Sequence, residues 1–172
     1  MAFSLRTSSS PASSLPGRIL AIDYGRRRIG LAVSDAMGLT AQPLATLVRT
    51  NRRNDLRRLR QIVRRHEVRR IVVGHPVHLD GTAGEMAAEA ARFAARIEKE
   101  LSLPVELVDE RLSSWEAEQI LTAAAVSSAR QRGAWQQPRG PARRRSPGAV
   151  DQVAAAVILR DYLERARKQA KD

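Results

Sequence analysis

Apolar residues follow two different spacings along the chain, and each spacing predicts a different kind of element. Short runs rich in β-branched residues predict five strands, at residues 18–23, 29–35, 44–49, 70–74 and 105–109. Apolar residues three or four positions apart predict four helices, at residues 52–65, 82–101, from 113 onward, and 149–168. The resulting order is three strands, then helix, strand, helix, strand and two helices.

This order predicts a mixed α/β fold. Three consecutive strands are typical of an antiparallel meander, and the later alternation of strands and helices requires parallel strands joined by right-handed crossovers. We therefore expect one five-stranded sheet, antiparallel in its first part and parallel in the rest, flanked by helices. Within that sheet, the strand at 70–74 should separate the parallel strands 18–23 and 105–109.

Turn and capping residues set the expected boundaries of these elements. Pro43 is a strand breaker, so the third strand is expected to begin after it. Two capping-box patterns, Thr82-x-x-Glu85 and Ser113-x-x-Glu116, predict the starts of the second and third helices.

The length and composition fit one packed domain. The chain has 172 residues, of which 43% are hydrophobic, enough for a single core. The domain is expected over residues 18–168, between a Ser- and Pro-rich tail at 1–17, expected to be disordered, and a short tail at 169–172. Residues 126–148 carry six arginines and no acidic residue, and they predict a flexible loop.

Several classes of protein are excluded at this stage. The chain has no cysteine, which excludes a disulfide scaffold, thiolate zinc sites and a cysteine nucleophile. The longest stretch without a charge, residues 36–48, is too short for a transmembrane helix, so no membrane partner is expected. No apolar signal-peptide core follows Met1, which favours a cytoplasmic protein.

The charge balance favours a polyanionic partner. The formal net charge is +12, which is typical of proteins that bind nucleic acid. An alternative explanation is codon usage in a GC-rich genome, because 27 of the 30 basic residues are Arg. Charge alone therefore does not settle the function.

Three carboxylates are candidates for chemistry because each stands at the end of an element. Asp23 ends an otherwise apolar strand, where a buried carboxylate needs a cation or hydrogen-bond donors; turn amides alone would be the alternative. Glu110 directly follows strand 105–109, at the edge where α/β sheets bind ligands, unless it only pairs with Arg111 at the surface. Asp151 lies on the apolar face of the last helix and should turn toward the sheet. The alternative is that it only stabilises the N-terminus of that helix through the helix dipole.

Gathered at one edge of the sheet, these carboxylates would suit a hard cation. Mg²⁺ prefers oxygen ligands and pairs carboxylates with substrate phosphates. Two such ions can hold the attacking and leaving oxygens of a phosphodiester hydrolysis. The sequence offers no Ser-His-Asp or Cys-His arrangement that competes with this interpretation. Asp23, Glu110 and Asp151 therefore predict metal-assisted chemistry on phosphate.

Four motifs in order along the chain resemble those of the YqgF/RuvX family. They are Ile22-Asp23-Tyr24-Gly25 with Ile29-Gly30-Leu31-Ala32-Val33, Val73-Gly74-His75-Pro76 with Leu79-Asp80-Gly81-Thr82, Asp109-Glu110-Arg111-Leu112-Ser113-Ser114, and Asp151-Gln152 with Ala154-Ala155-Ala156-Val157-Ile158-Leu159. Together they span residues 18–163. The chain departs from the family pattern at Arg26, where a small hydroxyl residue is frequent, and at His75 and His78, whose roles stay open.

The resemblance implies an RNase H-like fold and an enzyme that hydrolyses phosphodiester bonds with Mg²⁺ or Mn²⁺. It implies that Asp23, Glu110 and Asp151 are the catalytic, metal-binding residues. Members of the family are described as nucleases that process the 5′ end of pre-16S rRNA in ribosome biogenesis, and also as Holliday-junction-resolvase-like. Structured precursor rRNA is therefore the first expected partner and branched DNA the second, while the choice between monomer and homodimer stays open.

The candidate contacts to nucleic acid are mostly arginines. Gly25 would let a phosphate approach the backbone, and the predicted helix start at Thr82 would offer amide groups to a phosphate. The remaining candidates are Arg26, Arg28, Arg57, Arg64, Arg111, Arg143 and Arg144. A solvated helix face and a disordered basic loop are the alternative for the arginines of 52–65 and 130–145.

Other functions remain open alongside the nuclease. A non-catalytic module that binds nucleic acid would use the same fold. A phosphotransferase of the actin-like type needs two domains with a second Asp-x-Gly loop, for which this chain is too short. A zinc site on His75, His78 and Asp80 is a weaker alternative, because a loop histidine more often hydrogen-bonds to backbone or phosphate.

Overall fold

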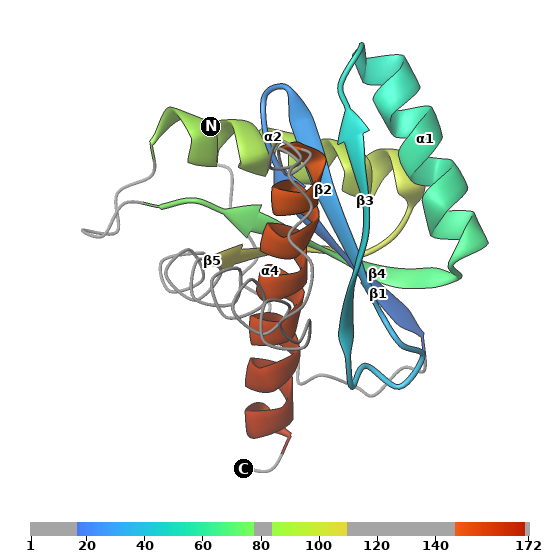
Figure 1. Cartoon of the computed structure of the whole chain (residues 1–172), viewed down its shortest axis with the longest axis vertical. Coiled ribbons are helices and arrows are strands. Elements are labelled where there is room, and N and C mark those ends of the chain that lie inside the picture. Colours follow the sequence, from blue (N-terminus) through green and yellow to red (C-terminus); the bar gives the residue numbers. More distant parts are fainter. Residues whose placement is uncertain (1–16, 78–83, 110–146, 171–172) are drawn as a thin grey trace, which may run out of the picture.

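The computed structural model describes residues 17–77, 84–109 and 147–170 of the chain. The strands within these ranges are β1 (Arg18–Tyr24), β2 (Arg28–Ser34), β3 (Ala41–Val48), β4 (Val68–His75) and β5 (Val105–Asp109). The helices are α1 (Arg52–Arg65), α2 (Glu85–Leu101) and α4 (Pro147–Gln169). Figure 1 shows how these elements are arranged.

The strands form one mixed sheet in the order β3-β2-β1-β4-β5. The pairs β1–β2 and β2–β3 are antiparallel, whereas β1–β4 and β4–β5 are parallel. The prediction of one mixed five-stranded sheet, antiparallel in its first part and parallel in the rest, is therefore confirmed, including the place of β4 between β1 and β5.

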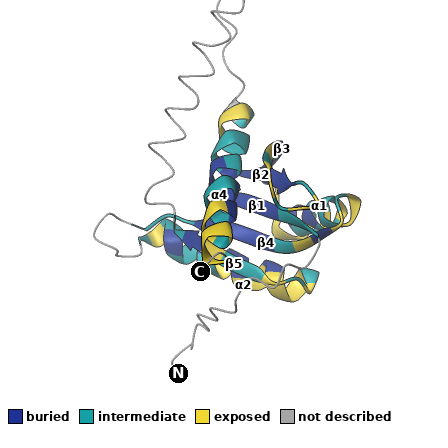
Figure 2. Cartoon of the chain, turned by 90° about the horizontal axis from the view of Figure 1, so that it is seen from below, coloured by how far each residue is buried: buried dark blue, intermediate teal, exposed yellow. Residues whose placement is uncertain are grey.

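Helices cover both faces of this sheet, because the side chains of each strand alternate between the two faces. Leu20 and Ile22 of β1 pack in one core with residues of α1 and α2, such as Leu59 and Phe93. Ala21 of β1 packs in a second core with residues of α4. Figure 2 shows the buried strands in the centre and the exposed residues on the outer sides of the helices.

Helix α4 is held against its face of the sheet by polar contacts along its length. Near its start, Thr46 Oγ1 donates a hydrogen bond to the Gly148 carbonyl at 2.5 Å. Further along, Arg70 of β4 donates to the Tyr162 hydroxyl at 3.1 Å and also pairs with Glu106 of β5. These contacts fix the helix relative to β3, β4 and β5, and so fix the position of Asp151.

Strand β3 begins earlier than predicted. It starts at Ala41 and contains Pro43, so the expectation that the strand would begin after this proline was wrong. The structural reason is that β3 lies at the edge of the sheet, where a residue without an N–H is tolerated. The register with β2 also shifts beside Pro43, which pairs with Ala32.

The starts of two helices also differ from the predictions. Gly84 is the N-cap of α2, so the prediction that a capping box at Thr82 begins this helix was wrong. Glu85 instead forms an ion pair with Arg26, in the turn between β1 and β2. Helix α4 begins at Pro147 rather than Ala149, since proline is well suited to the first position of a helix.

Some predictions fall on residues that the structure does not describe. They are the tail at 1–16, the helix after Ser113, and the loop at 126–146. Among the described helices, none is both long enough and apolar enough to span a membrane.

Candidate active site

Asp23 lies near the carboxyl end of β1, on the face of the sheet that α4 covers. It follows the alternation set by Ala21, which packs against α4, and it is partly buried. Its partner across the antiparallel ladder is Gly30 of β2. The side chain of Asp23 therefore faces the start of α4.

Gly30 allows α4 to approach the sheet closely at this point. A Cβ atom at this position would lie 2.0 Å from the Asp151 carbonyl oxygen and 3.1 Å from the Asp151 Cβ atom. Because Gly30 is the ladder partner of Asp23, the residue that rests on Gly30 lies beside Asp23. The glycine thus brings together two carboxylates that are far apart in the sequence.

Helix α4 turns Asp151 toward the sheet. Its helical face continues through Ala155, Ile158 and Leu159, all of which are buried. The Asp151 side chain is 21% exposed to solvent, so it lies at the edge of the core rather than inside it. The predicted inward orientation of Asp151 is confirmed.

The two carboxylates differ in their partners. Arg28 of β2 donates a hydrogen bond from Nε to Oδ2 of Asp151 at 2.7 Å. No residue in the described part of the chain donates a hydrogen bond or forms an ion pair to the Asp23 carboxylate. Burial, and then the negative charge of Asp151, raise the pKa of Asp23 to about 6.

This arrangement fits a divalent cation. A partly buried carboxylate that lacks a donor and faces a second carboxylate is stabilised by a bound positive charge. Carboxylate oxygens are the ligands that Mg²⁺ and Mn²⁺ prefer. The third predicted ligand, Glu110, lies outside the described residues, one position after the end of β5. Within the described ranges, no group of three potential metal ligands occurs.

The turn between β1 and β2 carries two further predicted residues, Gly25 and Arg26. A Cβ atom on Gly25 would lie 2.5 Å from the Arg28 carbonyl oxygen, so the turn itself requires this glycine. The Arg26 guanidinium group pairs with Glu85 and Glu89 of α2, each at 2.8 Å. Arg26 therefore joins the turn to α2.

Sequence reasoning missed a cluster around Arg49 that supports this turn. Its guanidinium group donates to the Tyr24 hydroxyl at 2.9 Å and to the Gly25 carbonyl at 3.1 Å. It also pairs with the buried Asp55 at 3.3 Å and lies 4.9 Å from the centre of the Tyr24 ring. The only hints in the sequence were a basic residue at the end of a strand and an acid in the first turn of a helix, both of which are common.

The structure does not bring Arg57 and Arg64 to the carboxylates. Both lie on α1, which packs on the face of the sheet opposite to α4. Their predicted contact with the nucleic-acid backbone would therefore lie away from the carboxylates, and it stays a prediction. His75 ends β4 and is partly buried. The remaining predicted residues lie outside the described part of the chain: Glu110, Thr82, Arg111, Arg143, Arg144 and His78.

Comparison with known proteins places this chain in a family. The model of the RuvX family, described as Holliday junction resolvase, matches residues 17–165. A protein of Koribacter versatilis, named "Putative pre-16S rRNA nuclease", is 45% identical over 89% of this chain and 90% of its own length. A protein of the same name from Anaeromyxobacter dehalogenans strain 2CP-C is 46% identical over 86% of this chain and 97% of its own length.

Among solved structures, the comparison found the RuvC of T. thermophilus in complex with a Holliday junction substrate. It shares 16% sequence identity, covers 87% of this chain and 96% of its own, and superposes with a TM-score of 0.49. The family match covers all five strands of the sheet together with Asp23 and Asp151. The chain therefore belongs to the RuvX family.

Proposed function

We propose that this protein is a nuclease that uses Mg²⁺ or Mn²⁺ to hydrolyse phosphodiester bonds, and that it processes the 5′ end of pre-16S rRNA. The observation that carries the proposal is the Asp23 carboxylate, which faces Asp151, receives no hydrogen bond from the described residues and has a raised pKa. A partly buried pair of carboxylates is costly in a purely structural role and useful as a metal ligand set. A cytoplasmic location, where ribosomal precursors are made, goes with this proposal.

The roles of the residues follow from their positions. Asp23 and Asp151, together with Glu110, would hold the metal, which supplies positive charge to activate a water molecule and to stabilise the leaving oxygen. Asp23 must lose its proton to act as a ligand, so protons should compete with the metal for this carboxylate as the pH falls through about 6. Arg28 donates a hydrogen bond to one oxygen of Asp151, and its positive charge would compete with the metal for that carboxylate.

Ribosomal RNA is the first choice of substrate because curated relatives at 43–46% identity are named for it. A four-way DNA junction is the alternative, since the description of the family model names it. Both substrates present the same phosphodiester group, so the carboxylates serve either one. The net charge of +12 supports a nucleic-acid substrate of either kind.

The test is cleavage of two labelled substrates, a precursor rRNA with its 5′ leader and a four-way DNA junction. Each is incubated with Mg²⁺, with Mn²⁺ and with EDTA. The variants are Asp23→Asn and Asp151→Asn, and the matched control is Asp35→Asn. Asp35 lies in the turn after β2, at the opposite end of the sheet, where its Oδ1 accepts hydrogen bonds from the Leu39 and Thr40 amides.

We expect metal-dependent cutting of the RNA at its 5′ leader, loss of cutting in both site variants, and normal cutting by the control. Symmetric cutting of the DNA junction alone would replace the rRNA proposal with the resolvase. Binding without metal-dependent cutting of either substrate would refute the nuclease and favour a non-catalytic binding module.

A further inference from the structure

Two turns rich in arginine lie side by side at the same end of the sheet as the carboxylates. One joins β1 to β2 and carries Arg27, and the other joins β3 to α1 and leads to Arg52 and Arg53. The two turns are connected directly, because the Arg49 amide donates a hydrogen bond to the Arg27 carbonyl at 3.0 Å. Figure 1 shows that the β1–β2 turn, the start of α1 and the start of α4 occupy one end of the molecule.

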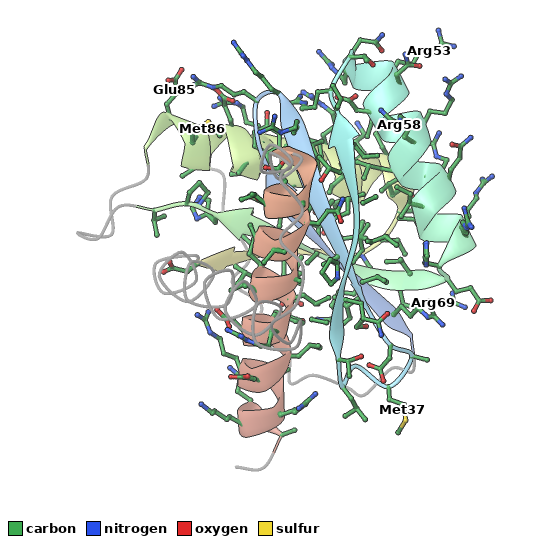
Figure 3. The ribbon with its side chains drawn as sticks, viewed as in Figure 1. Met37, Arg53, Arg58, Arg69, Glu85 and Met86 are labelled. Carbon is green, nitrogen blue, oxygen red and sulfur yellow. The ribbon has the colours of Figure 1, made fainter. Side chains whose placement is uncertain are left out.

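The arginines of these turns fall into two groups. Arg26, Arg28 and Arg49 are engaged in ion pairs with acids of this chain. In contrast, Arg27, Arg52 and Arg53 are exposed, and no acid in the described ranges pairs with them. Figure 3 shows Arg53 at the N-terminal end of α1, pointing away from the ribbon.

Within the described ranges, no acid pairs with these three side chains, which leaves their positive charge uncompensated there, at the same end of the sheet as the candidate active site. Arg28, which contacts Asp151, directly follows Arg27 in the chain and is the ladder partner of Val48 at the end of β3. Arg28 lies two residues from Gly30 along β2, a distance of roughly 7 Å. The charged surface therefore begins one residue before Arg28, the residue that contacts Asp151, and continues toward the start of α1.

We propose that Arg27, Arg52 and Arg53 form an arginine shelf that binds the phosphate groups of the substrate backbone beside the bond that is cut. The ligand is the phosphodiester backbone of a nucleic acid, which arginine recognises through its charge and its forked donors. This inference rests on the proposed function and adds the path that the bound substrate strand follows beyond the carboxylates. Along this path the backbone runs over β2 and β3 toward the start of α1.

The shelf makes a different prediction from net charge alone. Arg65, Arg69 and Arg96 are also exposed and also lack a paired acid among the described residues. Arg65 stands thirteen positions after Arg52 on α1, about 20 Å along the helix axis. Figure 3 shows Arg69 well away from Arg53, toward the other end of the molecule. If only the total charge mattered, the two sets of arginines would contribute equally.

The test compares two triple variants of the full chain that lose the same charge. The shelf variant is Arg27→Gln with Arg52→Gln and Arg53→Gln, and the control variant is Arg65→Gln with Arg69→Gln and Arg96→Gln. Binding to a fluorescent precursor-rRNA leader and to a DNA of the same sequence is measured by anisotropy in EDTA over a range of salt. Thermal melting of each variant confirms that it is folded.

At 0.1 M salt, each arginine removed from the shelf should weaken binding about 5- to 8-fold, and the log–log salt slope of the triple variant should fall by about 2–3. The control variant should bind like the wild type. Similar losses of affinity on RNA and DNA support recognition of the backbone. Equal losses in the two variants, or no loss in the shelf variant, would overturn the shelf. Because binding is measured without metal, either of those results leaves the cleavage test of the carboxylates to be judged separately.

Discussion

Replacing Gly30 with alanine tests whether the contact between β2 and α4 builds the site. The added Cβ atom would lie 2.0 Å from the Asp151 carbonyl oxygen, whereas ordinary van der Waals contact begins at 3.4 Å. The atom it meets belongs to the backbone, which cannot rotate away as a side chain could. Helix α4 must therefore retreat from the sheet by more than about 1 Å.

This displacement of α4 should lower the free energy of unfolding by a predictable amount. Overpacking of a dense core costs about 1–3 kcal/mol, and a backbone contact in a helix tied down by Thr46 and Arg70 belongs at the upper end of this range. For a domain of this size, about 3 kcal/mol corresponds to a fall in melting temperature of about 6–12 °C. The same movement takes Asp151 away from Asp23, so the affinity for Mn²⁺ should fall as well.

Thermal melting and calorimetric titration with Mn²⁺ measure the two effects. The matched control is Gly148→Ala, also at the contact of α4 with the sheet. There the new Cβ atom would meet the Thr46 side chain at 3.3 Å, and alanine favours the helix by about 1 kcal/mol over glycine. We expect the control to melt within a few degrees of the wild type. A Gly30→Ala protein that melts and binds Mn²⁺ like the wild type would refute the idea that this contact positions Asp151.

Three further predictions concern the site and the core beneath it. The pKa of Asp23 is raised to about 6 in the folded protein, so ionisation of this carboxyl lowers the free energy of unfolding as the pH rises from about 4 to 6. In EDTA, Asp23→Asn should therefore be more stable than the wild type at pH 7–8, by roughly 2–3 kcal/mol. Below pH 4 the two proteins should be equally stable. Melting curves across this pH range would contradict the reasoning if the difference between the two proteins did not change. Arg28→Gln removes a positive charge 2.7 Å from Asp151, so calorimetry at pH 7 should find Mn²⁺ bound about 5-fold more tightly, and weaker binding would mean that Arg28 assembles the site. Leu159→Ala removes a fully buried side chain from the core under α4 and should cost about 2–5 kcal/mol in urea unfolding, whereas a loss below about 1 kcal/mol would contradict the packing described for this helix.

Much of the fold could be predicted from the sequence, because the strands are short apolar runs bounded by turn residues. Strand β5 was predicted with both ends correct, and β1 and β2 to within one residue. The start of β3 could not be predicted, since tolerance of Pro43 depends on its place at the edge of the sheet. The start of α2 at Glu85 was obscured by a capping pattern at Thr82 that the helix does not use.

The site was predictable only in part. Asp23 and Asp151 could be found because one ends an apolar strand and the other lies on the apolar face of a helix. No local pattern separates Arg26, Arg27 and Arg28, which are consecutive and chemically identical. In the structure the first pairs with α2, the second faces solvent and the third pairs with Asp151. Those differences arise from the helices that pack on each face of the sheet, which neighbouring residues in the sequence do not encode.

The contact between Arg28 and Asp151 has a consequence for how the protein is made. These residues lie 123 positions apart in the sequence, and Asp151 belongs to the last of the described helices. During synthesis β1, β2 and β3 leave the ribosome long before α4, so the growing chain holds Asp23 without its partner carboxylate. If Asp151 holds the metal as proposed, the metal site is complete only after α4 has docked on the sheet.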